Sequence, residues 1–237
     1  MDIITKAYKE SVGSLVVPLG FKSYRKNYYR VINDIFQSVN LHKSVSGDNC
    51  TIEFVIAPLC AGDFIKKDFC GTNHLKMFKN DYSWFPYNKD DEGSVNNCVG
   101  EMISYVETYL IPYFERSSDS TKAYYEVCAF QEHHKHGMQP FDYLLFCMSL
   151  KAGLYDKSLE HLYAQKKQTE YAYNSNKQFR EQQGQQLSTE YSERIANKIK
   201  LIEYQTEMIS RFDIEYIHSF IRENERRALA NLGILRE

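Results

Sequence analysis

The sequence IFQSVNLHK occupies Ile35–Lys43, and the sequence TIEFVIAP occupies Thr51–Pro58. In both runs the apolar residues recur at every second position, which is the side-chain period of a β-strand. Gln37 is the one interruption of the apolar face in the first run. Between the runs, Ser46–Asn49 reads SGDN, a composition typical of a tight turn. The two runs therefore predict adjacent antiparallel strands, the second of which ends at Pro58.

The chain before Ile35 predicts one more strand and a helix. Tyrosine and valine at β-favouring spacing precede a turn at Asn33–Asp34, which gives a third strand in the same meander. From Asp2 to Val17 the apolar residues fall on one helical face, and Pro18 and Gly20 end that helix. We expect an antiparallel sheet of three to five strands packed by helices.

Helical periodicity replaces alternation after Ser94. The helix that begins there has apolar residues at every third or fourth position, and Pro112 predicts a kink or an end near Ile111. From Thr121 onward all predicted elements are helical. The sequence thus predicts an α+β fold with two parts, an α+β domain over residues 1–120 and a helical extension or bundle over residues 121–237, which either docks on the sheet or projects from it.

Two segments of the helical part have open interpretations. Residues 165–198 are polar and poor in aliphatic side chains, so they form either a long exposed helix or a partly mobile connection. Between Ile195 and Leu235 apolar residues return at heptad-like spacing, as in a closing helical hairpin or in a coiled-coil contact with a partner.

Composition and charge give limited information about partners and compartment. The formal net charge of -2 gives no global attraction to nucleic acid or to acidic membranes. No apolar run is long enough to span a membrane, and the N-terminus lacks a basic segment followed by an apolar one, so we expect no membrane partner and a cytoplasmic location. The six cysteines contain no Cys-x-x-Cys pair, which predicts reduced structural thiols in that compartment.

Candidates for metal and acid chemistry are few. The cluster EHHKH places His133 and His136 near each other on a helix, which offers two or three metal ligands, against the simpler reading of a solvated helix end. Asp63, Asp68 and Asp81 lie in a loop-rich stretch where they either meet in a cleft or make turns. No nucleotide-binding, hydrolase or zincin motif is present, so we predict no cofactor, and the chain leans away from being an enzyme.

A basic and aromatic alternation is the best candidate binding face. If the chain forms one continuous strand here, five side chains share a face on which tyrosines stack bases and cations neutralise phosphates; they are Lys22, Tyr24, Lys26, Tyr28 and Arg30. A turn at Lys26–Asn27 would break that register, and a solvated outer face is the competing reading. The single tryptophan, Trp84, is expected to anchor the core between the sheet and the long helix.

Part of the chain resembles a known family. The segments that carry the likeness are Leu19–Phe21, Tyr28–Arg30, Ile35–Ser44, Thr51–Phe54, Asp81–Phe85 and Leu110–Phe114. They resemble an uncharacterised bacterial family, domain-of-unknown-function family 4304, over about residues 6–120. The resemblance implies a fold but no catalytic residues, because the family carries no assigned activity.

These observations favour a noncatalytic protein that acts by binding another protein, with an immunity-like or regulatory role in a bacterial cell. The alternatives are a nucleic-acid-binding protein that uses the face from Lys22 to Arg30, and an unrecognised hydrolase or metal enzyme that uses the histidines or the loop carboxylates.

Overall fold

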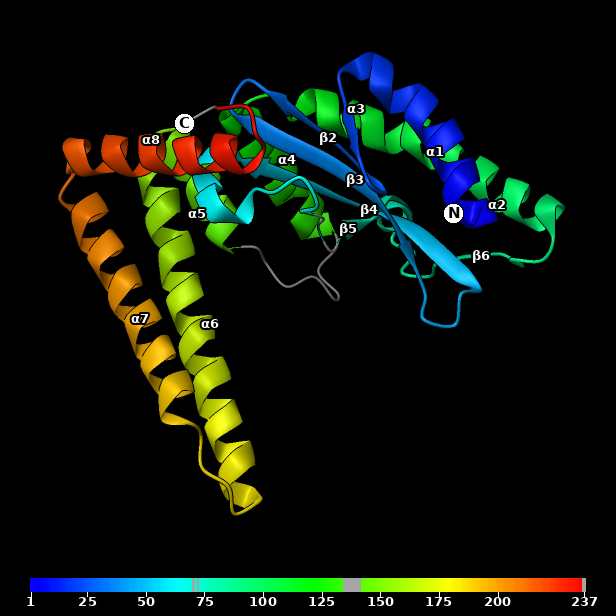
Figure 1. Ribbon diagram of the computed structural model, residues 1–237. Helices are drawn as coiled ribbons and strands as arrows, with labels where there is room; N and C mark the ends of the chain where they lie inside the picture. The colour runs from blue at the N-terminus through cyan, green and yellow to red at the C-terminus, as the bar shows by residue number, and fades with distance from the viewer. Residues whose placement is uncertain (70, 72, 134–141, 236–237) are drawn as a thin grey trace.

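An antiparallel sheet forms the centre of the N-terminal half in the computed structural model, which describes residues 1–69, 71, 73–133 and 142–235 (Figure 1). Its strand order is β1-β2-β3-β4-β5, and β6 also pairs with β4. The strands are β1 (Lys22–Tyr24), β2 (Asn27–Ile32), β3 (Ile35–Lys43), β4 (Asn49–Pro58), β5 (Asn73–His74) and β6 (Phe85–Pro86). The α+β class is confirmed, and the sheet has six strands because two short ones add to the edge of β4.

The predicted alternation sets the register of the two long strands. Val39 pairs with Phe54 and Leu41 with Ile52, so these apolar side chains share one face of the sheet. That face packs into a first core together with α1 (Ile3–Val16), α2 (Glu92–Tyr105), α3 (Ile111–Arg116) and α4 (Ser120–His133). The burial of this face is why the register is tightly specified, since a slip by one residue would expose every apolar side chain on it.

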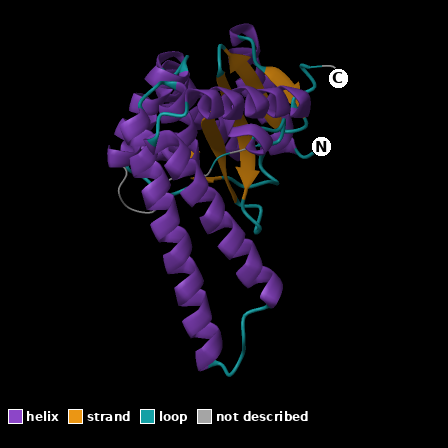
Figure 2. Ribbon diagram, turned by 90° about the vertical axis from the view of Figure 1, so that its left-hand side faces the viewer, coloured by secondary structure: helices purple, strands orange, loops and turns teal. Residues whose placement is uncertain are grey.

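The opposite face of the sheet is also partly covered. Phe36 and Val55 join a second core with η2 (Leu59–Phe64), α5 (Asp142–Lys151), α6 (Tyr155–Gln182), α7 (Thr189–Ser210) and α8 (Ile214–Asn231). The base of the helical half therefore docks on the sheet. The outer parts of α6 and α7, over residues 170–201, project from the sheet as a long helical hairpin, which we call the arm (Figures 1 and 2).

The long helix after Ser94 contains an irregular turn next to its proline. Five residues, Val106–Leu110, form a π-helical turn, and the helix then continues as α3 through Arg116. Pro112 cannot donate a backbone hydrogen bond, and its ring crowds the preceding turn, so the local hydrogen-bond pattern widens there. The predicted kink is thus an irregular turn rather than an end of the helix.

Trp84 does not anchor the core, which corrects the sequence-based expectation. It is half-buried, and its ring lies edge-on to His42 with the centroids 5.0 Å apart. The adjacent Phe85 is fully buried instead, where it contacts the Tyr105 ring of α2 at 5.6 Å. Phe85 is directed inward by its pairing with Cys50 of β4, whereas Trp84 precedes β6 and has no place in this pairing.

Asp2 begins α1 and ties it to the sheet, which gives a first prediction. Its carboxylate accepts a hydrogen bond from the backbone N–H of Thr5 at 2.9 Å and pairs with Lys43 of β3. Partial burial alone would raise the pKa, but the hydrogen bonds from Lys43 and Thr5 lower it to about 2. Because the folded pKa is depressed, the stabilisation is present above the unfolded value of 3.8 and is lost as the pH falls towards 2. An NMR titration of the Asp2 carboxyl should show this low midpoint, and Lys43→Gln should raise it; an ordinary midpoint in the unmodified protein would contradict the contact.

Candidate functional site

The predicted basic and aromatic face is divided by a hairpin. The chain turns at Arg25 and Lys26, and Arg25 has a left-handed φ of 54°. Tyr24 pairs with Asn27 across this turn and packs against the second core, whereas Tyr28 belongs to the first core. The two tyrosines therefore lie on opposite faces of the sheet, and the continuous strand on which the nucleic-acid interface depended is not formed.

Tyr28 and Arg30 are occupied by internal contacts. The hydroxyl of the buried Tyr28 donates to the carbonyl of Lys9 at 3.0 Å. Arg30 donates from Nε to Oε1 of Gln37 at 2.8 Å and from Nη1 to the carbonyl of Leu19 at 2.7 Å. Lys22 and Lys26 are exposed on different parts of the hairpin. The structure thus does not bring the five predicted side chains together on one face.

The remaining sequence candidates are two histidines and three loop carboxylates. His133 is exposed at the end of α4, and His136 lies outside the described residues. Asp63 lies 3.8 Å from Arg227, Asp81 lies 3.8 Å from Lys76, and Asp68 is exposed. Within residues 1–69, 71, 73–133 and 142–235, no three histidine, cysteine or acidic side chains are grouped so that they could hold a metal ion. In the same ranges, none of the helices combines the length and the apolar character needed to cross a bilayer.

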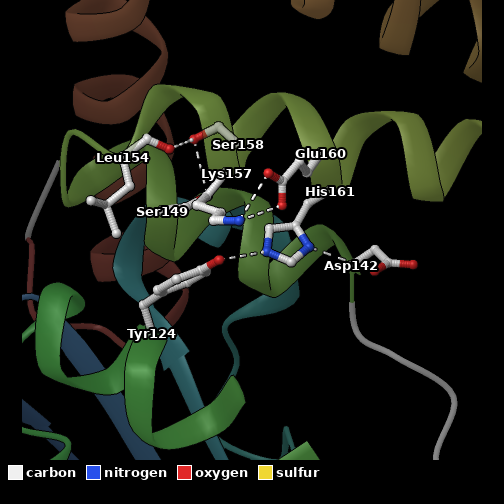
Figure 3. Close-up of polar contacts among 8 residues, drawn as sticks. All are labelled: Tyr124, Asp142, Ser149, Leu154, Lys157, Ser158, Glu160 and His161. Carbon is white, nitrogen blue, oxygen red and sulfur yellow. Dashed lines mark hydrogen bonds and ion pairs between the residues drawn. The ribbon is translucent and has the colours of Figure 1, made fainter. Parts of the chain in front are cut away.

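A buried polar chain joins α4, α5 and α6 (Figure 3). The Tyr124 hydroxyl lies 3.1 Å from Nε2 of His161, and Nδ1 of His161 lies 3.8 Å from Oδ1 of Asp142. Beside it, the Ser149 and Ser158 hydroxyls lie 3.0 Å apart, and Ser158 also contacts the Leu154 carbonyl. Three helices that are separate in the sequence are therefore linked by polar side chains.

The order carboxylate, imidazole, phenol is one that some catalytic groups use, but this geometry fits a structural role. The gap of 3.8 Å between His161 and Asp142 exceeds a hydrogen bond. Burial raises the pKa of the Tyr124 phenol, so it stays protonated and a poor nucleophile at neutral pH. Burial also raises the pKa of the neighbouring Cys128 thiol. We interpret this network of polar side chains as a structural link that holds α4, α5 and α6 together.

A hollow at the root of the arm is the stronger candidate for a binding site. It has a volume of about 420 Å³ and lies between η2, α5, the inner parts of α6 and α7, and α8. Its walls include the rings of Tyr143, Tyr216 and Phe220. Phe64 and Leu201 at its edge are 54% and 55% exposed. Concave sites with apolar walls and a few polar groups are the usual places for ligands and anchoring side chains.

The shape of the hollow depends on a close approach of η2 to α8. Gly62 has a φ of 64° and ψ of -122°, and a Cβ atom there would lie 2.6 Å from Oδ1 of Asn224. Only glycine meets both conditions without strain. The polar rim of the hollow includes Lys198 of α7 and the acidic and basic side chains Glu223 and Arg227 of α8.

The polar groups of the hollow differ in how they are paired. Arg227 forms an ion pair with Glu223 one turn away and lies 3.8 Å from Asp63. Lys198 forms no ion pair with any residue that the structure describes. Burial raises the pKa of Tyr216 to about 12, although a hydrogen bond with Gln205 opposes that shift. The four charged side chains that line the hollow sum to no net charge, and Lys198 is the one of them without an ion pair among the described residues; they are Asp63, Lys198, Glu223 and Arg227.

The arm has exposed aromatic side chains and no core of its own. All residues from 170 to 201 are described, and none of them is buried. Tyr171 is 74% exposed and Phe179 is 55% exposed. The two helices meet through partly exposed side chains, such as Tyr173 and Tyr191, whose stacked rings have centroids 6.2 Å apart.

Sequence reasoning recognised the polar character of residues 165–198 but missed the hollow. Its walls come from five separate elements, so no local pattern could reveal them. The one local signal was Gly62, two residues before Phe64 in a loop-rich stretch, and such a pattern is common in any protein. Comparison of the chain with models of protein families, with curated proteins and with solved structures finds no match, so the likeness to the bacterial family stays a prediction.

Proposed function

We propose that this protein is a noncatalytic protein-binding protein whose recognition element is the arm. The observation that carries the proposal is the absence of any buried side chain over residues 170–201, combined with the exposure of Tyr171 and Phe179. Helices are marginal in water unless they bury an apolar face against another element. Exposed aromatic residues on such a helix pair are therefore accounted for by a partner that covers them.

The chemistry of the arm supports a protein as that partner. Tyrosine and phenylalanine supply much of the binding energy at protein interfaces, because they bury large areas with few rotatable bonds. The surrounding surface carries both signs of charge, for example Lys177 and Glu181, which lie 4.0 Å apart. A mixed polar surface with aromatic side chains is less suited to a nucleic acid, which requires a cluster of unpaired cations.

The compartment and the biological role of the protein are proposed as well. We propose the cytoplasm as its compartment, because the chain carries six cysteines without a paired motif. An immunity-like or regulatory role agrees with binding through an arm, since such proteins act by contact and need no catalytic group.

Site-specific photo-crosslinking in cells tests the proposal. p-Benzoylphenylalanine placed at position 171 or 179 should crosslink to one and the same protein, because both positions lie in the covered surface. The same probe at position 125 should not, since Tyr125 is 58% exposed on α4, away from the arm. The double substitution Tyr171→Ser with Phe179→Ser should weaken binding of the purified partner by at least about tenfold, as loss of interface aromatic residues does.

The matched control is Gln178→Ser, an exposed polar position beside Phe179, which should leave binding unchanged. Hydrogen exchange should also show that amides in residues 170–201 become protected when the partner is added. Crosslinks from position 125 alone, or an unchanged affinity of the double variant, would refute the arm as the recognition element.

A further inference from the structure

We propose that the hollow at the root of the arm accepts an aromatic side chain of the protein that the arm binds, and that a neighbouring carboxylate of that protein pairs with Lys198. This inference rests on the proposed function for one point, namely that the ligand is a segment of a protein. The hollow itself is argued from its own walls, mouth and charges.

The walls of the hollow favour a ring. Tyr143, Tyr216 and Phe220 line it, and the Phe64 ring lies 4.9 Å from that of Tyr143. Aromatic side chains attract a further ring by edge-to-face or offset stacking in addition to the burial of apolar area. A volume of about 420 Å³ lies within the range of roughly 300–1,000 Å³ typical of ligand clefts. It has room for a ring and for the backbone on either side of it.

The mouth of the hollow favours a protein segment as the occupant. Phe64 from η2 and Leu201 from α7 are both more than half exposed, so an occupant must lie across the edge to cover them. Gln165 and Lys198, which also line the hollow, belong to the same two helices as the arm. A protein lying along the arm therefore meets the hollow without leaving the surface of α6 and α7.

The charges of the hollow favour an acidic neighbour of the ring. Arg227 already faces two carboxylates, those of Glu223 and Asp63. Lys198 has no such partner among the described residues, so its ammonium group is available to a carboxylate from outside. An ion pair at an exposed rim adds little affinity but selects the correct partner and register.

Binding of two capped dipeptides to the full-length protein tests the inference. Acetyl-phenylalanyl-aspartyl-amide should bind weakly and shift the NMR methyl signals of Leu201 and Ile202, both of which line the hollow. Acetyl-alanyl-aspartyl-amide should show no binding, because it lacks the ring. Acetyl-phenylalanyl-asparaginyl-amide should bind about threefold more weakly at low salt, since the contact with Lys198 is exposed and screened.

Variants at exposed positions separate the contribution of the aromatic wall from that of the charge. Phe64→Ser should abolish dipeptide binding, whereas Tyr125→Ser on α4 should not. Lys198→Gln should remove the preference for aspartate over asparagine, whereas Lys200→Gln, which changes the same charge two residues away, should keep it. Binding that is indifferent to the ring, or an aspartate preference that survives Lys198→Gln, would overturn the inference.

The two proposals fail separately. Loss of crosslinking from the arm with dipeptide binding intact would refute the arm as the recognition element and leave the hollow as a site. Intact crosslinking without dipeptide binding would refute the hollow alone.

Discussion

Truncation of Phe54 to alanine should lower the free energy of unfolding by about 3–5 kcal/mol, as for other large buried aromatic residues. Phe54 is fully buried on β4, at the centre of the first core. Its ring lies 5.3 Å from Phe78, 5.9 Å from Tyr113 and 5.8 Å from Phe130. These rings belong to three separate segments, so no single neighbour can move to fill the cavity. Urea unfolding followed by circular dichroism measures the effect.

The matched control for Phe54 is Phe179→Ala on the arm. That side chain is more than half exposed, so its removal should change the free energy of unfolding by less than about 0.5 kcal/mol. A cost below about 1 kcal/mol for Phe54→Ala would contradict the tight packing of these rings.

Substitution of Gln37 by leucine should lower the free energy of unfolding by about 2–4 kcal/mol, even though it makes the strand more apolar. Gln37 is fully buried, and its Nε2 donates to the carbonyls of Phe114 at 2.7 Å and Ser117 at 3.1 Å. Its Oε1 accepts a hydrogen bond from Arg30 at 2.8 Å. Leucine would leave the carbonyls at the end of α3 and the guanidinium without these partners.

A double-mutant cycle with Arg30→Met isolates the contact between the two side chains. The two substitutions together should cost clearly less than the sum of their separate costs, because each one removes the same hydrogen bond. Gln178→Leu, at an exposed position on the arm, serves as the control for the change in side-chain type. Equal costs of Gln37→Leu and Gln178→Leu would show that the buried amide contributes nothing.

Regular local patterns made much of the fold predictable. The alternation in Ile35–Lys43 and in the run before Pro58 predicts β3 and β4, and both confirm the α+β class. Gln37 stood out in that pattern as an unexplained polar residue. The sequence could not show its role, because the carbonyls that it binds, those of Phe114 and Ser117, lie far along the chain at the C-terminal end of α3.

The features that the sequence did not predict depend on a single backbone conformation, on strand register or on tertiary contacts. The sequence left open whether the chain continues as one strand past Lys26 or turns there, and the left-handed conformation of Arg25 makes it a hairpin, although arginine has no strong preference for such a turn. Phe85 took the position expected of Trp84 because register with β4, rather than side-chain size, decides which neighbour faces inward. The hollow depends on elements that only the tertiary structure brings together.

The absence of buried side chains over residues 170–201 affects the affinity with which a partner could bind the arm. A partner that covers residues 170–201, as proposed, would have to order exposed side chains such as Tyr171 and Phe179 on association, which reduces the affinity gained per unit of contact area. A change of about 1.4 kcal/mol in the binding free energy would alter the dissociation constant of such a complex tenfold. The arm is thereby suited to transient attachment that a small change in either protein can make or undo.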